Sequence, residues 1–559
     1  MPIGVITVRL IPKRSFTAGR TYGKTYHCIF MLKSADGKIG TESIEEIGLD
    51  WGFTDNPDIV EELHQCYLSQ QKKEIQMKIS EIFELKKSQH ELDFVDVDID
   101  SDTPLFLDPY FIAKNDFPLA YEAHLSLRSY FECLLCALRE NRMADAEELF
   151  SHLGESNEIS LGFSRTKPQG KGMGPTDASK IFRSLKDSPA LRTGIMEDIE
   201  DFRIFVDNVD KDKMSDMTAN IIKKQLIDYT QAQCAIWGIK LTPSVPSGFY
   251  WDRSSNAWEN NYTEMLVADG RKILLVPKRL VSFSTEYTPQ KYMQHFVLNF
   301  LQNEQLRLNG PLVQRRKDRK RTPYVTKKSI REDEQLGDAI NKKWLADFTE
   351  KHPEVFSDFR KQTRSKIPAV SNAEISAEPL QKICSFLIDR LKAIPAGSDN
   401  ATVYHRTIVG ILELLFYPYL CNPVIEHEIH EGRKRIDIVF DNCAESGFFF
   451  RLCNTHSIPS RFIMIECKNY SRDVTNPEID QIGGRFSPNR GQMGIIACRS
   501  VDDMQKLIDR CSDTYKDSRG LIIPLVDDDF CELLKYKADK KEQAIDDFVQ
   551  MRFHMVASR

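Results

Sequence analysis

Two apolar, β-rich segments near the C-terminus carry charged residues that buried strands normally exclude. The segments are residues 435–440 (RIDIVF) and residues 462–470 (FIMIECKNY). Their composition predicts two strands. Side chains alternate between the two faces of a strand, so Glu466 and Lys468 should share one face. If the two strands pair, Asp437 can join them there.

Two carboxylates and one ammonium on one sheet face indicate a cation site. Such carboxylates repel each other unless a divalent cation lies between them, and hard oxygen ligands suit Mg²⁺ or Mn²⁺. A Mg²⁺ (or Mn²⁺) held by Asp437 and Glu466 would lower the pKa of a bound water. Lys468 would steer that water and offset charge in the transition state. The alternative is a structural ion pair of the carboxylates with Lys468 or Arg435, without catalysis.

The order Asp437, then Glu466-Cys467-Lys468, resembles the D…(D/E)-x-K signature of the PD-(D/E)XK nuclease superfamily. Glu413 lies upstream in an apolar run that predicts a helix over 407–417, and Gln481 lies downstream in a segment that opens a helix. The expected elements after Gln481 are a strand, a helix, a strand and a helix, at residues 491–498, 501–515, 520–526 and 529–536. Over roughly residues 400–540, this order resembles the catalytic domain of the Mrr-like restriction branch.

This resemblance implies a fold, further site residues and an activity. The fold is a C-terminal restriction-endonuclease-like α/β/α sandwich with a mixed central sheet. The backbone carbonyl of Cys467 would complete the metal coordination, and Gln481 would position the lysine or touch the phosphate. Glu413 would join a second metal or orient a metal-bound water, unless it simply reaches solvent from its helix. The implied activity is Mg²⁺-dependent DNA endonuclease cleavage, as an effector of microbial restriction or anti-phage defence.

The length of 559 residues is enough for several domains. We expect an α/β multidomain chain in which a mixed α+β N-terminal region precedes the nuclease domain. The expected divisions are 1–110 (a β-rich piece with a long helix), 111–340 (a mixed α/β region for sensing, gating or partner binding), 341–400 (a helical linker), 401–545 (the nuclease domain) and 546–559 (a C-terminal tail).

A basic segment is the second candidate site. Its expected phosphate-contacting residues are Arg315, Arg316, Lys317, Arg319, Lys320 and Arg321. The alternative is a solvated linker. The net charge of −6 and the pI of about 6.1 are not typical of a dedicated nucleic-acid binder, so local charge carries this interpretation.

Three weaker patterns have mainly structural interpretations. Residues 92–99 alternate aspartate with apolar residues, which favours an acidic solvent face over a second metal site. The insert between the two strands holds Cys443, Cys453 and His456. Zinc binding by these three would need a fourth ligand, so partner contact or core packing is preferred. The 13 cysteines, several of them within apolar runs, fit reduced thiols in a cytosol.

Partners and location follow from what the sequence contains. No apolar run approaches the length of a membrane span and no secretory signal is visible, so we expect a cytoplasmic protein without a membrane partner. DNA is the expected substrate, and cutting two strands favours a homodimer or larger assembly. No Walker A motif is present, so any ATPase, helicase or sensor would be a separate subunit.

Two rival functions stay open. One is an adaptor whose nuclease-like domain only grips nucleic acid or a partner protein. The other is a nuclease that acts on RNA or on recombination intermediates.

Overall fold

In the computed structural model, the described residues are 78–115, 117–162, 175–317, 320–337, 339–364, 368–425 and 438–558, preceded by the main chain of three strands. Contacts divide the chain into two units, Met1–Gln76 and Met77–Arg559. The first unit contains an antiparallel sheet of β1 (Thr7–Pro12), β2 (Tyr26–Lys33) and β3 (Ile39–Glu42). These strands lie where the sequence predicts a β-rich piece.

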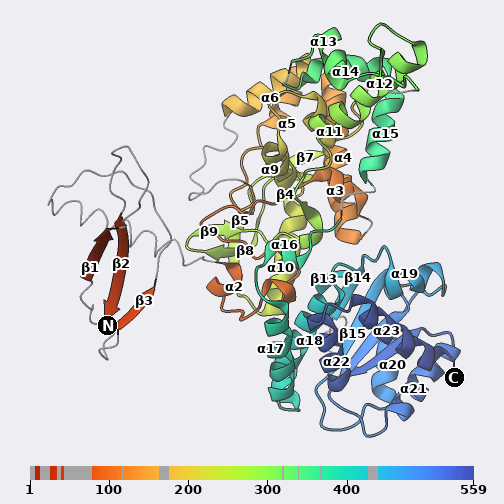
Figure 1. The fold of residues 1–559 in the computed structure, drawn as a ribbon. Coiled ribbons are helices and arrows are strands. Elements are labelled where there is room, and N and C mark those ends of the chain that lie inside the picture. Colours follow the sequence, from red (N-terminus) through yellow and green to blue (C-terminus); the bar gives the residue numbers. More distant parts are fainter. Residues whose placement is uncertain are drawn as a thin grey trace. The chain divides into compact units, whose positions relative to one another are not determined.

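The first two-thirds of the second unit is mainly helical (Figure 1). Its helices are α2 (Ile79–Ile82), α3 (Pro109–Lys114), α4 (Pro118–Arg139), α5 (Met143–Phe150), α6 (Pro175–Asp187), α7 (Pro189–Thr193), α8 (Phe202–Phe205), α9 (Lys211–Ile221), α10 (Lys223–Trp237), α11 (Pro289–Lys291), α12 (Leu298–Leu308), α13 (Lys327–Asp333), α14 (Lys342–Lys351), α15 (Pro353–Arg364) and α16 (Asn372–Ile375). One π-helix, η4 (Tyr292–Val297), leads into α12, and short 3-10 turns include η1 (Gln89–Glu91), η2 (Ile199–Asp201) and η3 (Lys278–Leu280).

Short strands accompany these helices. The strands β5 (Thr242–Pro246), β8 (Tyr262–Ala268) and β9 (Arg271–Ile273) form one sheet, and two-stranded pairs are β4 (Phe106–Leu107) with β10 (Val281–Ser282), β6 (Tyr250–Asp252) with β7 (Ala257–Glu259), and β11 (Gln314–Arg315) with β12 (Pro323–Tyr324).

A five-stranded mixed sheet forms the C-terminal part of the second unit. Its strands, in spatial as well as chain order, are β13 (Leu420–Val424), β14 (Ile438–Asn442), β15 (Phe462–Lys468), β16 (Met493–Cys498) and β17 (Leu521–Val526). The first three are antiparallel neighbours, and the last three are parallel neighbours. β15 is therefore the strand at which the pairing changes direction.

Helices pack on this sheet in two groups (Figure 1). The helices are α17 (Leu380–Ala393), α18 (Ala401–Phe416), α19 (Gly447–Asn454), α20 (Asn476–Gly483), α21 (Met504–Lys516), α22 (Asp527–Ala538) and α23 (Glu542–Ala557). α17 and α18 pack with α22, while α21 packs with α20 and α23. Every residue of β16 and β17 is buried, as expected for strands covered on both faces.

Gly494 in β16 allows one of these helices to approach closely. A Cβ atom at this position would lie 2.5 Å from Cδ1 of Ile482 and 3.1 Å from the Met464 carbonyl oxygen. Ile482, on α20, is fully buried. The close contact fixes α20 against the sheet and so fixes the height at which its polar residues lie.

The sequence predicts this part of the chain well. The predicted helix over 407–417 is part of α18, and the strands and helices expected after Gln481 correspond to β16, α21, β17 and α22. With 53% helix and 15% strand, the expected mixed α/β class is confirmed. One difference lies at the end: the segment expected as a tail, 546–559, is largely helix α23, which buries Phe548, Val549 and Phe553.

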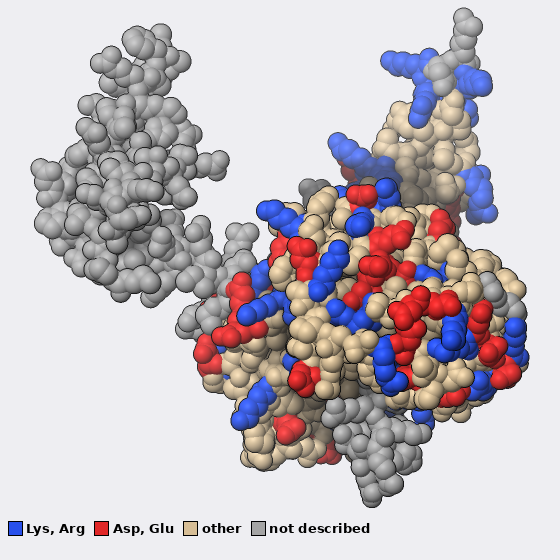
Figure 2. Space-filling model, turned by 90° about the horizontal axis from the view of Figure 1, so that it is seen from below, with Lys and Arg blue, Asp and Glu red and all other residues tan. Residues whose placement is uncertain are grey.

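The described surface mixes both signs of charge. On the face shown in Figure 2, lysine and arginine are interspersed with aspartate and glutamate among a larger area of other residues. This agrees with a net charge of only −6 for 559 residues. None of the helices in the described part of the chain combines the length and apolar character needed to cross a bilayer.

Candidate active site

The two strands that carry the predicted site are paired. β14 and β15 run antiparallel, with Ile438 opposite Ile465. This confirms the pairing that the sequence left as a condition. Asp437, and Arg435 before it, lie outside the described residues.

Three of the predicted residues meet at the end of β15. Lys468 Nζ lies 2.6 Å from Glu466 Oε1 and donates a hydrogen bond to Gln481 Oε1 at 3.2 Å. Glu466 and Lys468 therefore share one face of the strand, as their spacing predicts. Glu466 is 1% exposed and Lys468 is 8% exposed, so the lysine is the more accessible of the two charged groups.

Arg485 is a fourth member that sequence reasoning missed. Its Nη1 hydrogen-bonds to Glu466 Oε2, and only 7% of the residue is exposed. Arg485 follows Gln481 by four residues, just beyond the end of α20. That spacing puts two residues on the same side of a helix, so it is the signal that could have found Arg485.

Local structure holds these groups in place. Asn469, next to Lys468, donates hydrogen bonds to the carbonyl oxygens of Pro395 (3.0 Å) and Gly397 (2.8 Å). These bonds tie the end of β15 to the turn between α17 and α18. At the start of α20, Glu478 Oε2 accepts hydrogen bonds from the main-chain N–H (2.9 Å) and hydroxyl (2.8 Å) of Thr475, which caps the helix that carries Gln481.

The fit of this site to a divalent cation depends on Asp437. Glu466 supplies one carboxylate, and Cys467 supplies a main-chain carbonyl; both are oxygen ligands that suit Mg²⁺ or Mn²⁺. Within the described residues, no group of three or more His, Cys, Asp or Glu side chains could hold a metal ion. The carboxylates of Asp437 and Glu466 together with the Cys467 carbonyl would suit such an ion. The Glu466 carboxylate alone, which already contacts Lys468 and Arg485, would not.

Glu413 lies with other residues. It is fully buried on α18, and its Oε2 lies 3.8 Å from Lys278 Nζ, which is also fully buried. Lys278 Nζ also donates to Asn372 Oδ1 at 3.1 Å and lies 4.0 Å from the Tyr417 ring centroid. Among the described residues, Glu413 therefore contacts Lys278 rather than Glu466 or Lys468.

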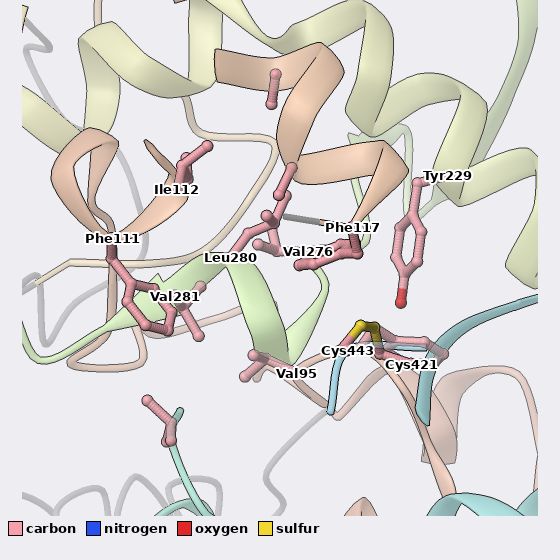
Figure 3. Packing of buried hydrophobic residues seen from close by; sticks show 14 of the residues in the cluster. Val95, Phe111, Ile112, Phe117, Tyr229, Val276, Leu280, Val281, Cys421 and Cys443 are labelled. Carbon is pink, nitrogen blue, oxygen red and sulfur yellow. A yellow bond between two sulfur atoms is a disulfide. The ribbon is translucent and has the colours of Figure 1, made fainter. Parts of the chain in front are cut away.

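Asp93 completes this second cluster. Its Oδ2 accepts a hydrogen bond from Tyr229 (2.7 Å) and its Oδ1 accepts one from the Asn422 main-chain N–H (3.0 Å). We call Asp93, Tyr229, Lys278, Glu413 and Asn422 the buried seam. In Figure 3, Tyr229 points from its helix toward the segments that carry Cys421 and Cys443.

Two structural expectations are wrong. Residues 92–99 do not form an acidic solvent face: Asp93 is 1% exposed, and Asp96 is 9% exposed and accepts hydrogen bonds from Ser80. Cys421 and Cys443 are joined by a disulfide, so not every thiol is reduced (Figure 3). In both cases the partner lies outside the local pattern: Ser80 is 16 residues from Asp96, and Cys421 is 22 residues from Cys443.

The insert that holds Cys443 packs into the core. Phe448 and Phe449 on α19 are buried, and the His456 ring lies 4.5 Å from the Phe553 ring. Cys453 Sγ contacts Ser460 Oγ at 3.2 Å. The structure therefore favours the core-packing interpretation of the insert.

Burial dominates the electrostatics of the seam. It raises the pKa of Glu413 well above the usual value; repulsion from Asp93 adds to this, and Lys278 opposes it. Burial also raises the pKa of Asp93 and lowers that of Lys278. Burial disfavours the charged form of each of these groups. The attraction between Lys278 and the two carboxyl groups offsets part of that cost.

Comparison with known protein families matches one segment of the chain, which includes part of the buried seam. A family model described as a domain of unknown function (DUF8370) matches residues 84–288. No curated protein and no solved structure matches the chain. The matched segment, here the DUF8370 segment, contributes Asp93, Tyr229 and Lys278 to the buried seam. Glu413 and Asn422 come from the C-terminal part, so the seam joins the two.

Asp441 lies beside the seam and should make the stability of the protein depend on pH. It is 3% exposed and accepts a hydrogen bond from Asn422 Nδ2 at 2.8 Å. Burial raises its pKa from 3.8 to about 7, with repulsion from Asp93 adding to this and Asn422 opposing it. The folded chain thus binds this proton more tightly than the unfolded chain, so its contribution to stability falls as the pH rises from about 4 to about 7.

Asp441→Asn removes that titration. Relative to the parent protein, this variant should gain stability between pH 5 and pH 8, by roughly 1–3 kcal/mol. Urea unfolding of both proteins at the two pH values measures the change. A stability difference that does not vary with pH would contradict the assignment.

Proposed function

We propose that the C-terminal part of the chain is a Mg²⁺-dependent nuclease that hydrolyses phosphodiester bonds in DNA. The observation that carries this proposal is the convergence of Lys468 on Glu466 and Gln481, at 2.6 and 3.2 Å. A lysine and a carboxylate two residues apart on one strand face, joined by a glutamine from the next helix, form the constellation that the D…(D/E)-x-K resemblance implies.

The order of the elements supports the same proposal. A helix (α18) precedes three antiparallel strands (β13, β14 and β15), and a helix (α20) then leads to a parallel fourth strand (β16). This order resembles the core of PD-(D/E)XK nucleases. Helices against both faces of the sheet fit the α/β/α sandwich that the resemblance implies.

The proposal includes the proximity of Asp437 to Glu466. In β14 and β15, Ile438 pairs with Ile465. Asp437 precedes Ile438 in the sequence, and Glu466 follows Ile465. Asp437, Glu466 and the Cys467 carbonyl would hold the metal, which when bound would supply an activated water and neutralise phosphate charge. Glu413 is not part of this proposed set.

The chain's own residues have distinct roles in the proposal. Lys468 orients the attacking water and stabilises the negative charge that develops on the phosphate. Gln481 holds the lysine by accepting its hydrogen bond. Arg485 hydrogen-bonds to the second oxygen of Glu466 and so fixes the orientation of that carboxylate.

One observation favours a second candidate, the nucleic-acid-binding adaptor. Each oxygen of Glu466 contacts a cation, Lys468 Nζ or Arg485 Nη1. An ion-pair network of this kind is satisfied without a metal, so a domain that only binds would retain it.

Cleavage assays separate these candidates. Purified full-length protein is incubated with plasmid DNA, linear DNA, single-stranded DNA and RNA, in Mg²⁺ or in EDTA. We expect DNA cleavage in Mg²⁺ and none in EDTA, and we expect Asp437→Asn to remove it. Absence of metal-dependent cleavage of any substrate favours the adaptor. Cleavage of RNA alone favours the nuclease that acts on RNA.

A further inference from the structure

The basic segment of the sequence forms an exposed two-stranded projection. β11 and β12 pair antiparallel, with Gln314 opposite Tyr324, and Arg316 N–H donates to the Thr322 carbonyl oxygen at 3.0 Å. We call the described residues 314–317 and 320–324 the basic arm; Arg319 lies outside the described residues. Its five basic side chains are all exposed: Arg315, Arg316, Lys317, Lys320 and Arg321.

These charges have no acidic partner within the described residues. Exposed basic residues elsewhere often do: Arg128 pairs with Glu132 at 2.9 Å, and Arg253 pairs with Glu122 at 3.0 Å. Local pairing keeps the field of most surface cations short-ranged, whereas the described part of the arm holds five cations without an acidic partner among the described residues.

The base of the arm is anchored. Val325 is 5% exposed, and its carbonyl oxygen accepts a hydrogen bond from Gln302 Nε2 of α12 at 2.6 Å. Ile330 of α13 is 2% exposed. Because the backbone at the base of the arm is already held in place, a partner that binds the arm need not order that backbone.

We propose that the basic arm binds the phosphate backbone of duplex DNA. Three of its five cations are arginines, whose planar guanidinium groups suit bidentate contact with phosphate. The only aromatic residue of the arm, Tyr324, is half-buried, and the Arg316 guanidinium lies 5.8 Å from its ring centroid. Single-strand binders stack bases on exposed aromatic rings, and the arm presents none.

This inference deepens the proposed function and rests on it for the choice of DNA among polyanions. The arm follows the DUF8370 segment in sequence and precedes the sheet that holds Lys468. The arm shares no residue with the candidate active site, so its contact with the duplex would be additional to any contact made there.

The test is equilibrium binding in EDTA, where no cleavage occurs. Full-length protein is titrated into a fluorescent 30-base-pair duplex at several NaCl concentrations, and anisotropy is measured. The variant replaces all five arm cations with glutamine. A matched control replaces five exposed basic residues from elsewhere: Arg128, Arg142, Lys224, Arg253 and Lys506. Both lower the net charge equally, and thermal unfolding verifies that both are folded.

We expect the arm variant to bind the duplex at least about tenfold more weakly at 0.1 M NaCl. Each lost phosphate contact should reduce the slope of log K against log salt by about 0.9, so a reduction of about 2 or more is expected. The control should stay within about threefold of the parent. An unchanged slope, or an equal loss in the control, overturns the proposal.

Two further ligands test the choice of partner. A larger loss for a 30-nucleotide single strand than for the duplex would overturn duplex binding. A loss confined to vesicles containing phosphatidylserine would overturn DNA binding. The two proposals fail in different ways. If only the nuclease proposal fails, the parent protein binds DNA through the arm and cuts nothing. If only the arm proposal fails, the parent protein cuts DNA and the arm variant keeps the parent's salt slope.

Discussion

Lys468→Ala is expected to lower DNA cleavage by about 10²–10³-fold, the usual cost of removing one group that stabilises transition-state charge. The lysine is 8% exposed and lies at the last position of β15, so the truncation leaves a cavity at the end of the strand rather than in the middle of the sheet. Glu466 keeps Arg485 as a partner. The fold should therefore survive, and thermal unfolding should show a midpoint within a few degrees of the parent.

Three comparisons make this loss interpretable. Lys506→Ala removes an exposed lysine from α21 and should leave cleavage unchanged. Lys468→Arg keeps the charge but replaces a compact ammonium with a planar fork, and it should restore only a small part of the rate. Calorimetric binding of Mn²⁺ to Lys468→Ala should persist, because the lysine is not a ligand. Cleavage by Lys468→Ala at the parent's rate would remove Lys468 from the mechanism.

Local signals explain why the C-terminal elements could be predicted. The apolar runs that predicted these strands and helices are each contained within a few residues of sequence. The alternation of side chains along a strand predicted that Glu466 and Lys468 share a face, and their 2.6 Å contact confirms it. Gln481 required only the additional expectation of a helix after β15.

Long-range contacts explain what could not be predicted. Asp93 looked like a surface residue because its partners, Tyr229 and Asn422, lie 136 and 329 positions away. The surroundings of Glu413 could not be predicted for the same reason, because its partner Lys278 belongs to the DUF8370 segment. A charged residue in an apolar run indicates that a partner exists, but the sequence alone does not say which residue that partner is.

Lys278→Met is expected to cost about 3–5 kcal/mol of unfolding free energy, the usual result of removing one partner from a buried charge pair. Lys278 and Glu413 are both fully buried, and Asp93 is 1% exposed. Without the lysine, two carboxyl groups would remain in the seam with no adjacent ammonium. The midpoint of urea unfolding, followed by tryptophan fluorescence, measures the loss. Lys382→Met, at an exposed position on α17, is the control and should change the free energy by less than about 0.5 kcal/mol.

Glu413→Gln should behave in the opposite way, and this contrast tests the assignment of charge. Burial and repulsion from Asp93 raise the pKa of Glu413, so a neutral amide of the same shape should cost no more than about 1 kcal/mol. In the double variant, Lys278→Met should cost less than it does alone, because one of the carboxyl groups that needed the lysine is gone. Equal costs in the two backgrounds would show that Lys278 does not interact with Glu413. The seam would then hold the DUF8370 segment to the C-terminal sheet through Asp93 and its hydrogen bonds alone.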